Sequence, residues 1–239
     1  MVKKQRLDKV LVHLGFGSRK EIKKLAKEGG ILVNNKVITD SSEHVNPEID
    51  EIIVGGKQVQ YREFIYLMLN KPTGVISATE DQREDTVIDL INPDFQAFQP
   101  FPVGRLDKDT EGLLILTNDG KLAHQLLSPK KHIPKTYYAK VKGEVTEVDA
   151  KQFKTGVILD DGYQTLPSEL VITETGAISQ VEITIYEGKY HQVKRMFLAV
   201  GKEVIYLKRI KMGLLALDEG LALGEYRELT ADELTLIKH

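Results

Sequence analysis

The sequence has 239 residues, 41% hydrophobic and 28% charged, a composition typical of a globular protein with a sizeable core and unlike that of disordered or collagen-like chains. It contains no cysteine, which excludes disulfide bonds and thiolate metal sites. The first residues lack the apolar run of a secretory signal, and the longest apolar run, Leu113–Leu116, is far shorter than the roughly 20 residues of a membrane span. We therefore expect a cytoplasmic protein.

The formal net charge of −2 hides two basic segments. Residues 1–36 hold ten Lys or Arg against three acidic residues, and the segment from Gly188 to Gly213 holds seven against one. Local potential rather than net charge decides whether a polyanion is attracted. Each segment fits a surface for a polyanion, and each also fits an ordinary solvated face.

The first residues predict two consecutive helices. Apolar residues recur with helical spacing from Leu7 to Leu14, and the glycines of segment 15–17 end that run. Ser18 followed by Glu21 is a capping-box pattern, so we expect a second helix to begin there.

The second predicted helix carries a row of like charges. Four lysines lie at i, i+3, i+4 and i+7 on a face distinct from its apolar stripe: Lys20, Lys23, Lys24 and Lys27. Like charges at this spacing repel and lower helix stability. A bound polyanion would relieve that repulsion.

A short hairpin is predicted next, with strands at 31–33 and 37–38 joined by Asn34-Asn35. The segments RLDKVL (6–11), GSRKE (17–21) and GILVN (30–34) resemble the small RNA-binding domain first known from ribosomal protein S4. This resemblance covers about residues 5–60 and implies that RNA is bound by Arg6, Arg19, Lys20, Lys23, Lys24 and Lys27. A polar stretch over 46–60 then precedes an apolar strand, so we expect two domains, 1–60 and 61–239.

The central segment, residues 102–120, places a charged loop directly before a buried-strand pattern, where functional residues are often found. A loop rich in ion pairs is one interpretation. A calcium loop is a second, but its twelfth position would be Asn118, which cannot supply a bidentate carboxylate. A single catalytic carboxylate beside a base-binding pocket is the third.

The third interpretation is favoured by resemblance to the pseudouridine synthases, most closely the branch that contains the ribosomal small-subunit enzyme A. The motifs that carry it are NKPTGVIS (70–77), GRLDKDTEG (104–112), PKTY (134–137), EGKYHQVKRM (187–196) and LKRIKMG (207–213). The resemblance implies an α+β chain in which the S4-like domain precedes a pseudouridine synthase fold with a bent mixed sheet. It also implies isomerisation of uridine, which exchanges no atoms or electrons with a cofactor, so we expect neither a cofactor nor a metal.

The same resemblance implies roles for three residues. Asp107 is the catalytic carboxylate, acting either by covalent attack or by proton abstraction to give a glycal. Desolvation disfavours an ionised carboxylate, so a cation must keep it charged. That cation is Lys194, where many relatives have arginine, or else Arg195. Tyr137 is the residue on which the target base stacks, and its phenol could serve in the final deprotonation.

Further residues are expected near the RNA or the loop. Asp109 and Glu111 are predicted to pair with Arg105 and Lys108 in a structural role. His191 is predicted to begin a helix and to position backbone or contact RNA. The full set of RNA contacts expected in the second domain is Arg105, Lys135, His191, Gln192 and Arg195.

After residue 61 the predicted helices do not alternate regularly with single strands, which favours an α+β class over a doubly wound sheet. Predicted strands cover 64–69, 112–117, 136–142, 168–172, 180–186 and 204–210, and predicted helices cover 86–91, 120–127, 146–154, 191–200 and 230–238.

The resulting hypothesis is a monomeric synthase that modifies one uridine of 16S ribosomal RNA in an assembling small subunit. The lack of a long basic tail favours 16S over 23S ribosomal RNA only weakly. A catalytically silent assembly factor that binds ribosomal RNA is the alternative from another class.

Overall fold

The computed structural model describes residues 4–238, which divide into two compact units. The first contains residues 4–65 together with Asn92–Pro100, and the second contains Tyr66–Ile91 and residues 101–238. Residues 92–100 thus pack with the first unit, although the composition change near residue 61 places them in the second domain. Within residues 4–238, no helix is both long and apolar enough to cross a membrane.

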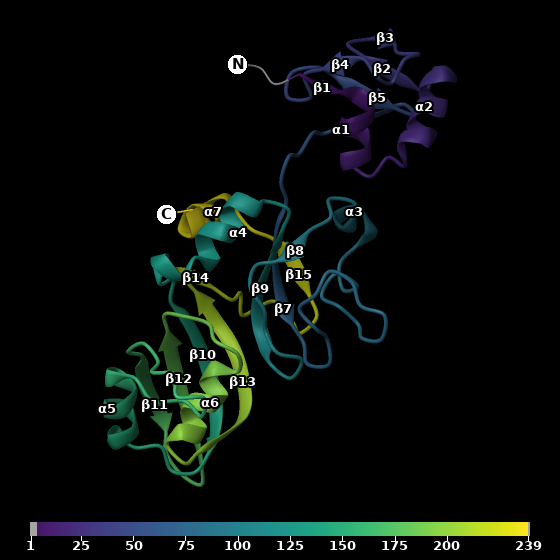
Figure 1. The fold of residues 1–239 in the computed structure, drawn as a ribbon. Helices are drawn as coiled ribbons and strands as arrows, with labels where there is room; N and C mark the ends of the chain where they lie inside the picture. The colour runs from purple at the N-terminus through teal and green to yellow at the C-terminus, as the bar shows by residue number, and fades with distance from the viewer. Residues whose placement is uncertain (1–3, 239) are drawn as a thin grey trace. The chain divides into compact units, whose positions relative to one another are not determined.

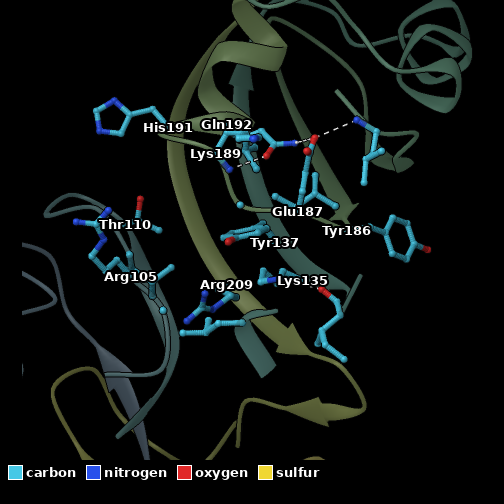
Figure 2. Close-up of a pocket in the computed structure, with 18 of the residues that line it drawn as sticks. Arg105, Thr110, Lys135, Tyr137, Tyr186, Glu187, Lys189, His191, Gln192 and Arg209 are labelled. Carbon is cyan, nitrogen blue, oxygen red and sulfur yellow. Dashed lines mark hydrogen bonds between the residues drawn. The ribbon is translucent and has the colours of Figure 1, made fainter. Parts of the chain in front are cut away.

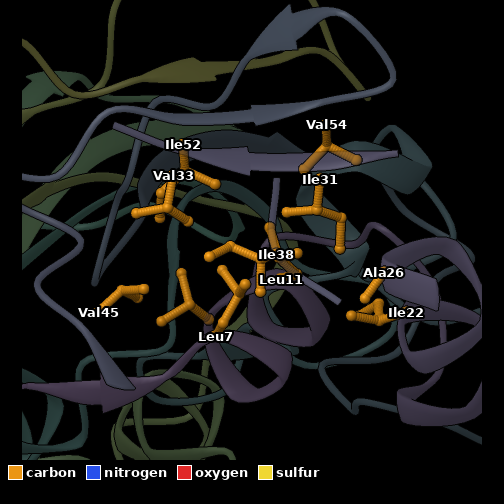
Figure 3. Packing of buried hydrophobic residues seen from close by; sticks show 11 residues of the cluster. Leu7, Leu11, Ile22, Ala26, Ile31, Val33, Ile38, Val45, Ile52 and Val54 are labelled. Atoms are coloured by element: carbon orange, nitrogen blue, oxygen red, sulfur yellow. The ribbon is translucent and has the colours of Figure 1, made fainter. Parts of the chain in front are cut away.

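The first unit packs two helices, α1 (Leu7–His13) and α2 (Arg19–Lys27), with a small antiparallel sheet. The strand order of this sheet is β3 (Lys36–Val37), β2 (Ile31–Val33), β5 (Ile52–Val54) and β6 (Lys57–Gln58), and β1 (Gln5–Arg6) pairs separately with β4 (His44–Val45). Its core consists of apolar side chains from both helices and the sheet, among them Leu7, Leu11, Ile22, Ile31 and Ile52 (Figure 3).

Local sequence explains this unit well. The Ser18 backbone N–H donates to the Glu21 carboxylate at 2.7 Å and the Glu21 N–H donates to Ser18 Oγ, so the predicted capping box forms. Asn34 and Asn35 have φ of 49° and 62°, the left-handed conformation that a tight hairpin turn requires. Both predicted helices and the predicted hairpin are confirmed.

The second unit is built on a nine-stranded mixed sheet (Figure 1). Its main path runs β11 (Glu169–Glu174), β12 (Ile178–Ile185), β10 (Lys135–Lys142), β13 (Glu203–Met212), β9 (Glu111–Thr117), β7 (Tyr66–Lys71) and β15 (Tyr226–Glu228). β14 (Leu215–Ala216) pairs with β13, and β8 (Phe101–Pro102) pairs with β9. The β13–β9 pair is parallel and spans two residue pairs, Lys208↔Glu111 and Arg209↔Gly112, whereas the other pairs are antiparallel.

Helices cover parts of this sheet. α4 (Gly120–Leu127) and α7 (Ala231–Lys238) contribute Leu122, Leu126 and Ile237 to a core with Met68 and Ile115 of the strands. α5 (Glu147–Thr155) and α6 (Gln192–Ala199) pack together through Phe153 and Phe197, whose ring centroids are 5.0 Å apart. The α+β class and the mixed sheet are confirmed.

One predicted helix is wrong. Residues 86–91 form successive turns, in which Asp89 N–H donates to Thr86 O and Ile91 N–H donates to Ile88 O. The Asp89 carboxylate also accepts from the backbone and hydroxyl of Thr86 at 2.8 Å. This is the bonding pattern of a helix start, but the turns do not continue as a helix, because Asn92 precedes Pro93 and is extended and the β-branched residues of the segment do not favour a helix. The short helix α3 (Pro93–Gln96), begun by Asn92, was not predicted.

Candidate active site

The second unit contains a pocket of about 420 Å³. One side is formed by the loop between β8 and β9, which carries Asp107 and Thr110. The other side is formed by β10, β13 and the start of α6, which bring Tyr137, Arg209 and Lys194. Figure 2 shows Tyr137 and Arg209 on adjacent strands, with Thr110 on the facing loop. The pocket therefore lies where β13 pairs with β9, the pairing that joins strands β11, β12, β10 and β13 to strands β9, β7 and β15.

The Asp107 loop is fixed through its backbone. The fully buried Lys71 donates from Nζ to the carbonyl oxygens of Pro72, Asp107 and Thr110 at 2.9, 3.1 and 3.0 Å. Ser77 Oγ donates to Leu106 O and accepts from Leu106 N–H. Burial lowers the pKa of Lys71 to about 8, against the attraction of Asp107 and other nearby carboxylates. The first motif thus holds the backbone around Asp107, a role that its sequence did not reveal.

Lys194 is the cation beside Asp107. Its Nζ lies 3.1 Å from Asp107 Oδ2 and 2.6 Å from Asp109 Oδ1. Burial acts to lower the pKa of Lys194, but the hydrogen bonds to the two carboxylates outweigh it and raise that pKa. Asp109, in turn, has its pKa lowered: burial opposes this change and the bond from Lys194 drives it. Lys194 is therefore held charged between two carboxylates.

Arg195 does not reach this pair. Its Nε donates to Asp160 Oδ1 at 2.6 Å, and its Nη2 lies 2.7 Å from Asp161 Oδ2. Of the two cations that the motif offers, the structure places Lys194 against Asp107.

His191 also contacts Asp107. Its Nε2 is 3.5 Å from Asp107 Oδ1, and its ring stacks on Tyr190 with centroids 3.8 Å apart. It is the N-cap of α6 and has φ of 48°, a left-handed conformation that is unusual away from glycine. The predicted helix start is confirmed, whereas proximity to the carboxylate could not be read from the sequence.

Tyr137 and Tyr138 lie on opposite faces of β10, as strand alternation requires. Tyr137 is buried in the pocket wall. Tyr138 donates to Gln180 and packs edge-on against Tyr206 outside the pocket. Of the two tyrosines, Tyr137 is therefore the one that faces the pocket.

The predicted partners of Asp109 and Glu111 are wrong. Asp109 pairs with Lys194, and Glu111 accepts from Tyr206 Oη at 2.7 Å. Lys108 pairs with Glu84 instead. These partners are remote in sequence, so short-range spacing could not identify them.

The other residues predicted to contact RNA in the second domain differ in how accessible they are. Arg105 is exposed at the pocket, and Lys135 lines it with its Nζ donating to Ile133 O. Gln192 is buried: its amide donates to Glu187 and accepts from the Lys189 backbone, so both of its ends are engaged within the chain.

In the first unit, α2 presents its basic side chains to solvent. Arg19, Lys20, Lys23, Lys24 and Lys27 are all exposed. Arg6 is half-exposed and forms an ion pair with the buried Asp8 at 2.7 Å. The lysine row is therefore accessible to a ligand.

The family model of RNA pseudouridylate synthases matches residues 65–199, and the model of the S4 domain matches residues 5–52. The chain therefore belongs to the RNA pseudouridine synthases, isomerases that act on RNA, and has an S4 domain ahead of the catalytic fold. The family predicted from the motifs is confirmed.

Its relatives lie in the branch that includes small-subunit enzyme A and large-subunit enzyme B. The chain is 55% identical to the uncharacterized RNA pseudouridine synthase YtzG of Bacillus subtilis, over 97% of this chain and 98% of the relative. It is 42% identical to ribosomal large subunit pseudouridine synthase B of the same organism (98% and 96%) and 38% identical to ribosomal small subunit pseudouridine synthase A of Escherichia coli (97% and 99%). A crystal structure of a pseudouridylate synthase matches with a TM-score of 0.69 and 35% identity, over 97% of this chain and 99% of the other.

Proposed function

We propose that this enzyme isomerises one uridine of ribosomal RNA, with Asp107 as its catalytic carboxylate. The reaction breaks the N1–C1′ bond, turns the base and joins C5 to C1′, while C5 loses a proton and the base regains one on nitrogen. The observation that carries the proposal is the position of Asp107, in the pocket wall and 3.1 Å from the Lys194 ammonium.

Asp107 is required as an anion for either chemical route. Covalent attack and proton abstraction both use the lone pair of an ionised carboxylate. Lys194 stabilises that anion and opposes the desolvation that a bound nucleoside imposes. His191, on the other carboxylate oxygen, and Lys71, on the loop backbone, restrict the orientation of Asp107.

Tyr137 provides the surface on which the extruded base stacks. Extrusion costs a few kcal/mol, and stacking on an aromatic ring recovers about 1–3 kcal/mol. Arg105 and Lys135 contact RNA at the rim, and the lysine row of α2 binds phosphates elsewhere on the same RNA.

Two ribosomal RNAs, 16S and 23S, are candidates for the target. The sequence favours a uridine of 16S ribosomal RNA in an assembling small subunit, modified by a monomer. A 23S target is supported by the 42% identity to large subunit synthase B. That relative is matched over 96% of its length, so the length of a tail does not separate the two candidate targets.

The decisive experiment maps pseudouridine in 16S and 23S ribosomal RNA from cells that lack the enzyme, complemented with the wild type or with Asp107→Asn. We expect one site to be lost on deletion, restored by the wild type and not by the variant. A site restored equally by Asp107→Asn would overturn the proposed mechanism. An unchanged map would favour the silent assembly factor.

A further inference from the structure

The pocket contains two buried polar groups that the mechanism above does not use. Within the described residues, three buried side-chain nitrogen or oxygen atoms have no hydrogen-bond partner, and two of them belong to pocket residues: Thr110 Oγ1 and Arg209 Nη2. Each residue is only 2% exposed. Unpartnered buried polar groups destabilise a protein and are rare, so two in one functional pocket require an explanation.

Arg209 is held rigidly beside the base-stacking residue. It is the direct cross-strand neighbour of Tyr137 in the β10–β13 pair, and such neighbours project from the same face about 5 Å apart. Its Nε donates to Leu113 O at 2.8 Å, which anchors the guanidinium. No carboxylate among the described residues pairs with it, and its charge acts on the pocket residue Lys135.

Thr110 lies on the facing loop, three residues after Asp107. Its backbone is engaged at both ends, by Asp107 O and by Lys71 Nζ, so only its hydroxyl is free. A hydroxyl can both donate and accept, whereas a guanidinium only donates.

We infer that Arg209 and Thr110 bind the Watson–Crick edge of the extruded pyrimidine, with Arg209 donating to the 4-oxygen of uracil and Thr110 accepting from N3–H. This inference rests on the proposed function and adds base selectivity to it. A phosphate on the RNA surface would bind an exposed cation, whereas Arg209 is 2% exposed and lines the pocket next to Tyr137. Cytosine carries an amino donor in place of the 4-oxygen and would leave Arg209 unpaired, so the same contact excludes cytosine.

The test combines a change in the protein with a change of one atom in the RNA. Single-turnover rates are measured for wild type and Arg209→Met on the mapped RNA and on the same RNA carrying 4-thiouridine at the target, in which a weakly accepting sulfur replaces the 4-oxygen and N3–H is kept. Any electronic effect of that change on the reaction is the same for both enzymes. It therefore cancels when the fold-change in rate of the wild type is divided by that of Arg209→Met. We expect the rate of the wild type to fall at least tenfold more than that of Arg209→Met. An equal fall in both would overturn the contact.

Lys208→Met is the matched control, because Lys208 is adjacent on β13 and does not line the pocket. It should respond to loss of the 4-oxygen as the wild type does. The wild-type rate on unmodified RNA is measured first, since an inactive wild type would reject the proposed function itself.

Thr110→Val provides an independent test that does not depend on the folding of Arg209→Met. Valine has nearly the shape of threonine and removes an unpartnered hydroxyl, so the melting temperature should be unchanged or higher. The rate should nevertheless fall about tenfold. Thr136→Val, whose hydroxyl pairs with Thr184 outside the pocket, is the control and should keep its rate. A fully active Thr110→Val would contradict the inference.

Discussion

Lys194 Nζ bridges two carboxylates of one loop, 3.1 Å from Asp107 and 2.6 Å from Asp109, across 87 and 85 residues of sequence. The shorter bond goes to the more exposed carboxylate, since the side chain of Asp109 is 72% exposed and that of Asp107 is 31% exposed. Asp109 thus helps to fix the ammonium from the solvent side, while Asp107 faces the pocket.

Replacing Lys194 with methionine should reduce the single-turnover rate by at least 100-fold and leave RNA affinity nearly unchanged. The apolar side chain retains most of the packing but leaves Asp107 without its cation. Rapid quench of tritium release from C5-labelled RNA measures the rate. Arg195→Met, which breaks the pairs with Asp160 and Asp161 and the bond to Tyr190 O but leaves Lys194 in place, is the control and should remain within threefold of the wild type. If Arg195→Met were slower than Lys194→Met, Arg195 rather than Lys194 would be the cation that acts on Asp107.

Replacing Tyr137 with leucine should lower the rate by about 5- to 150-fold, because stacking worth about 1–3 kcal/mol is lost. Tyr138→Leu, on the opposite face, should have little effect. Tyr137→Phe keeps the ring and separates stacking from any role of the phenol. Equal losses in Tyr137→Leu and Tyr138→Leu would contradict the assignment of the pocket-facing ring.

Changing Lys20, Lys23, Lys24 and Lys27 together to glutamine should weaken RNA binding and reduce the slope of log affinity against log salt by about 3. Each phosphate contact contributes about 0.7–0.9 to that slope. Filter binding between 50 and 300 mM salt checks it. Lys151 and Lys154, exposed on α5, are the control pair, and their replacement should leave the slope unchanged. An unaltered slope in the fourfold variant would remove α2 from the RNA interface.

Glu233 should stabilise the second unit in a pH-dependent way. Its carboxylate forms a two-pronged pair with Arg227 and accepts from Thr230 N–H at the start of α7. The bond from Arg227 is the main cause that lowers the pKa of Glu233 to about 2. A lowered folded-state pKa gives stability that is complete above the unfolded value near 4.5 and is lost as the pH falls toward 2.

Glu233→Gln should therefore lower the free energy of unfolding by about 1–2 kcal/mol at pH 7, and by progressively less below pH 4.5. Urea denaturation of both proteins at several pH values between 3 and 7 measures the difference. A difference that does not depend on pH would show that the charge of Glu233 is not responsible.

Sequence patterns predicted the elements that depend on local interactions. The capping box at Ser18, the hairpin turn at Asn34-Asn35 and the strand of Tyr137 follow from neighbours within a few residues. The motif order also identified the family. The helix predicted at 86–91 does not form because the segment ends at Asn92, whose extended backbone precedes Pro93, and apolar periodicity does not encode that stop.

The site could be predicted only in part. Asp107, Lys194 and Tyr137 were named from motifs, and the structure brings all three to one pocket. The contacts of His191, Lys71 and Arg209 were not predicted. Each depends on a β-sheet or loop arrangement that joins residues far apart along the chain, so no spacing rule reports it.

The narrow parallel pairing between β13 and β9 has a consequence for the timing of activity during synthesis. Asp107 leaves the ribosome long before Lys194, and the two are joined through strands that pair at Lys208–Glu111 and Arg209–Gly112. A Cβ at residue 112 would lie 2.2 Å from Arg209 O, so this contact tolerates only glycine. A nascent chain that lacks β13 can already expose its S4 domain but cannot yet complete the proposed site of Asp107 and Lys194, so modification must wait until β13 has been synthesised.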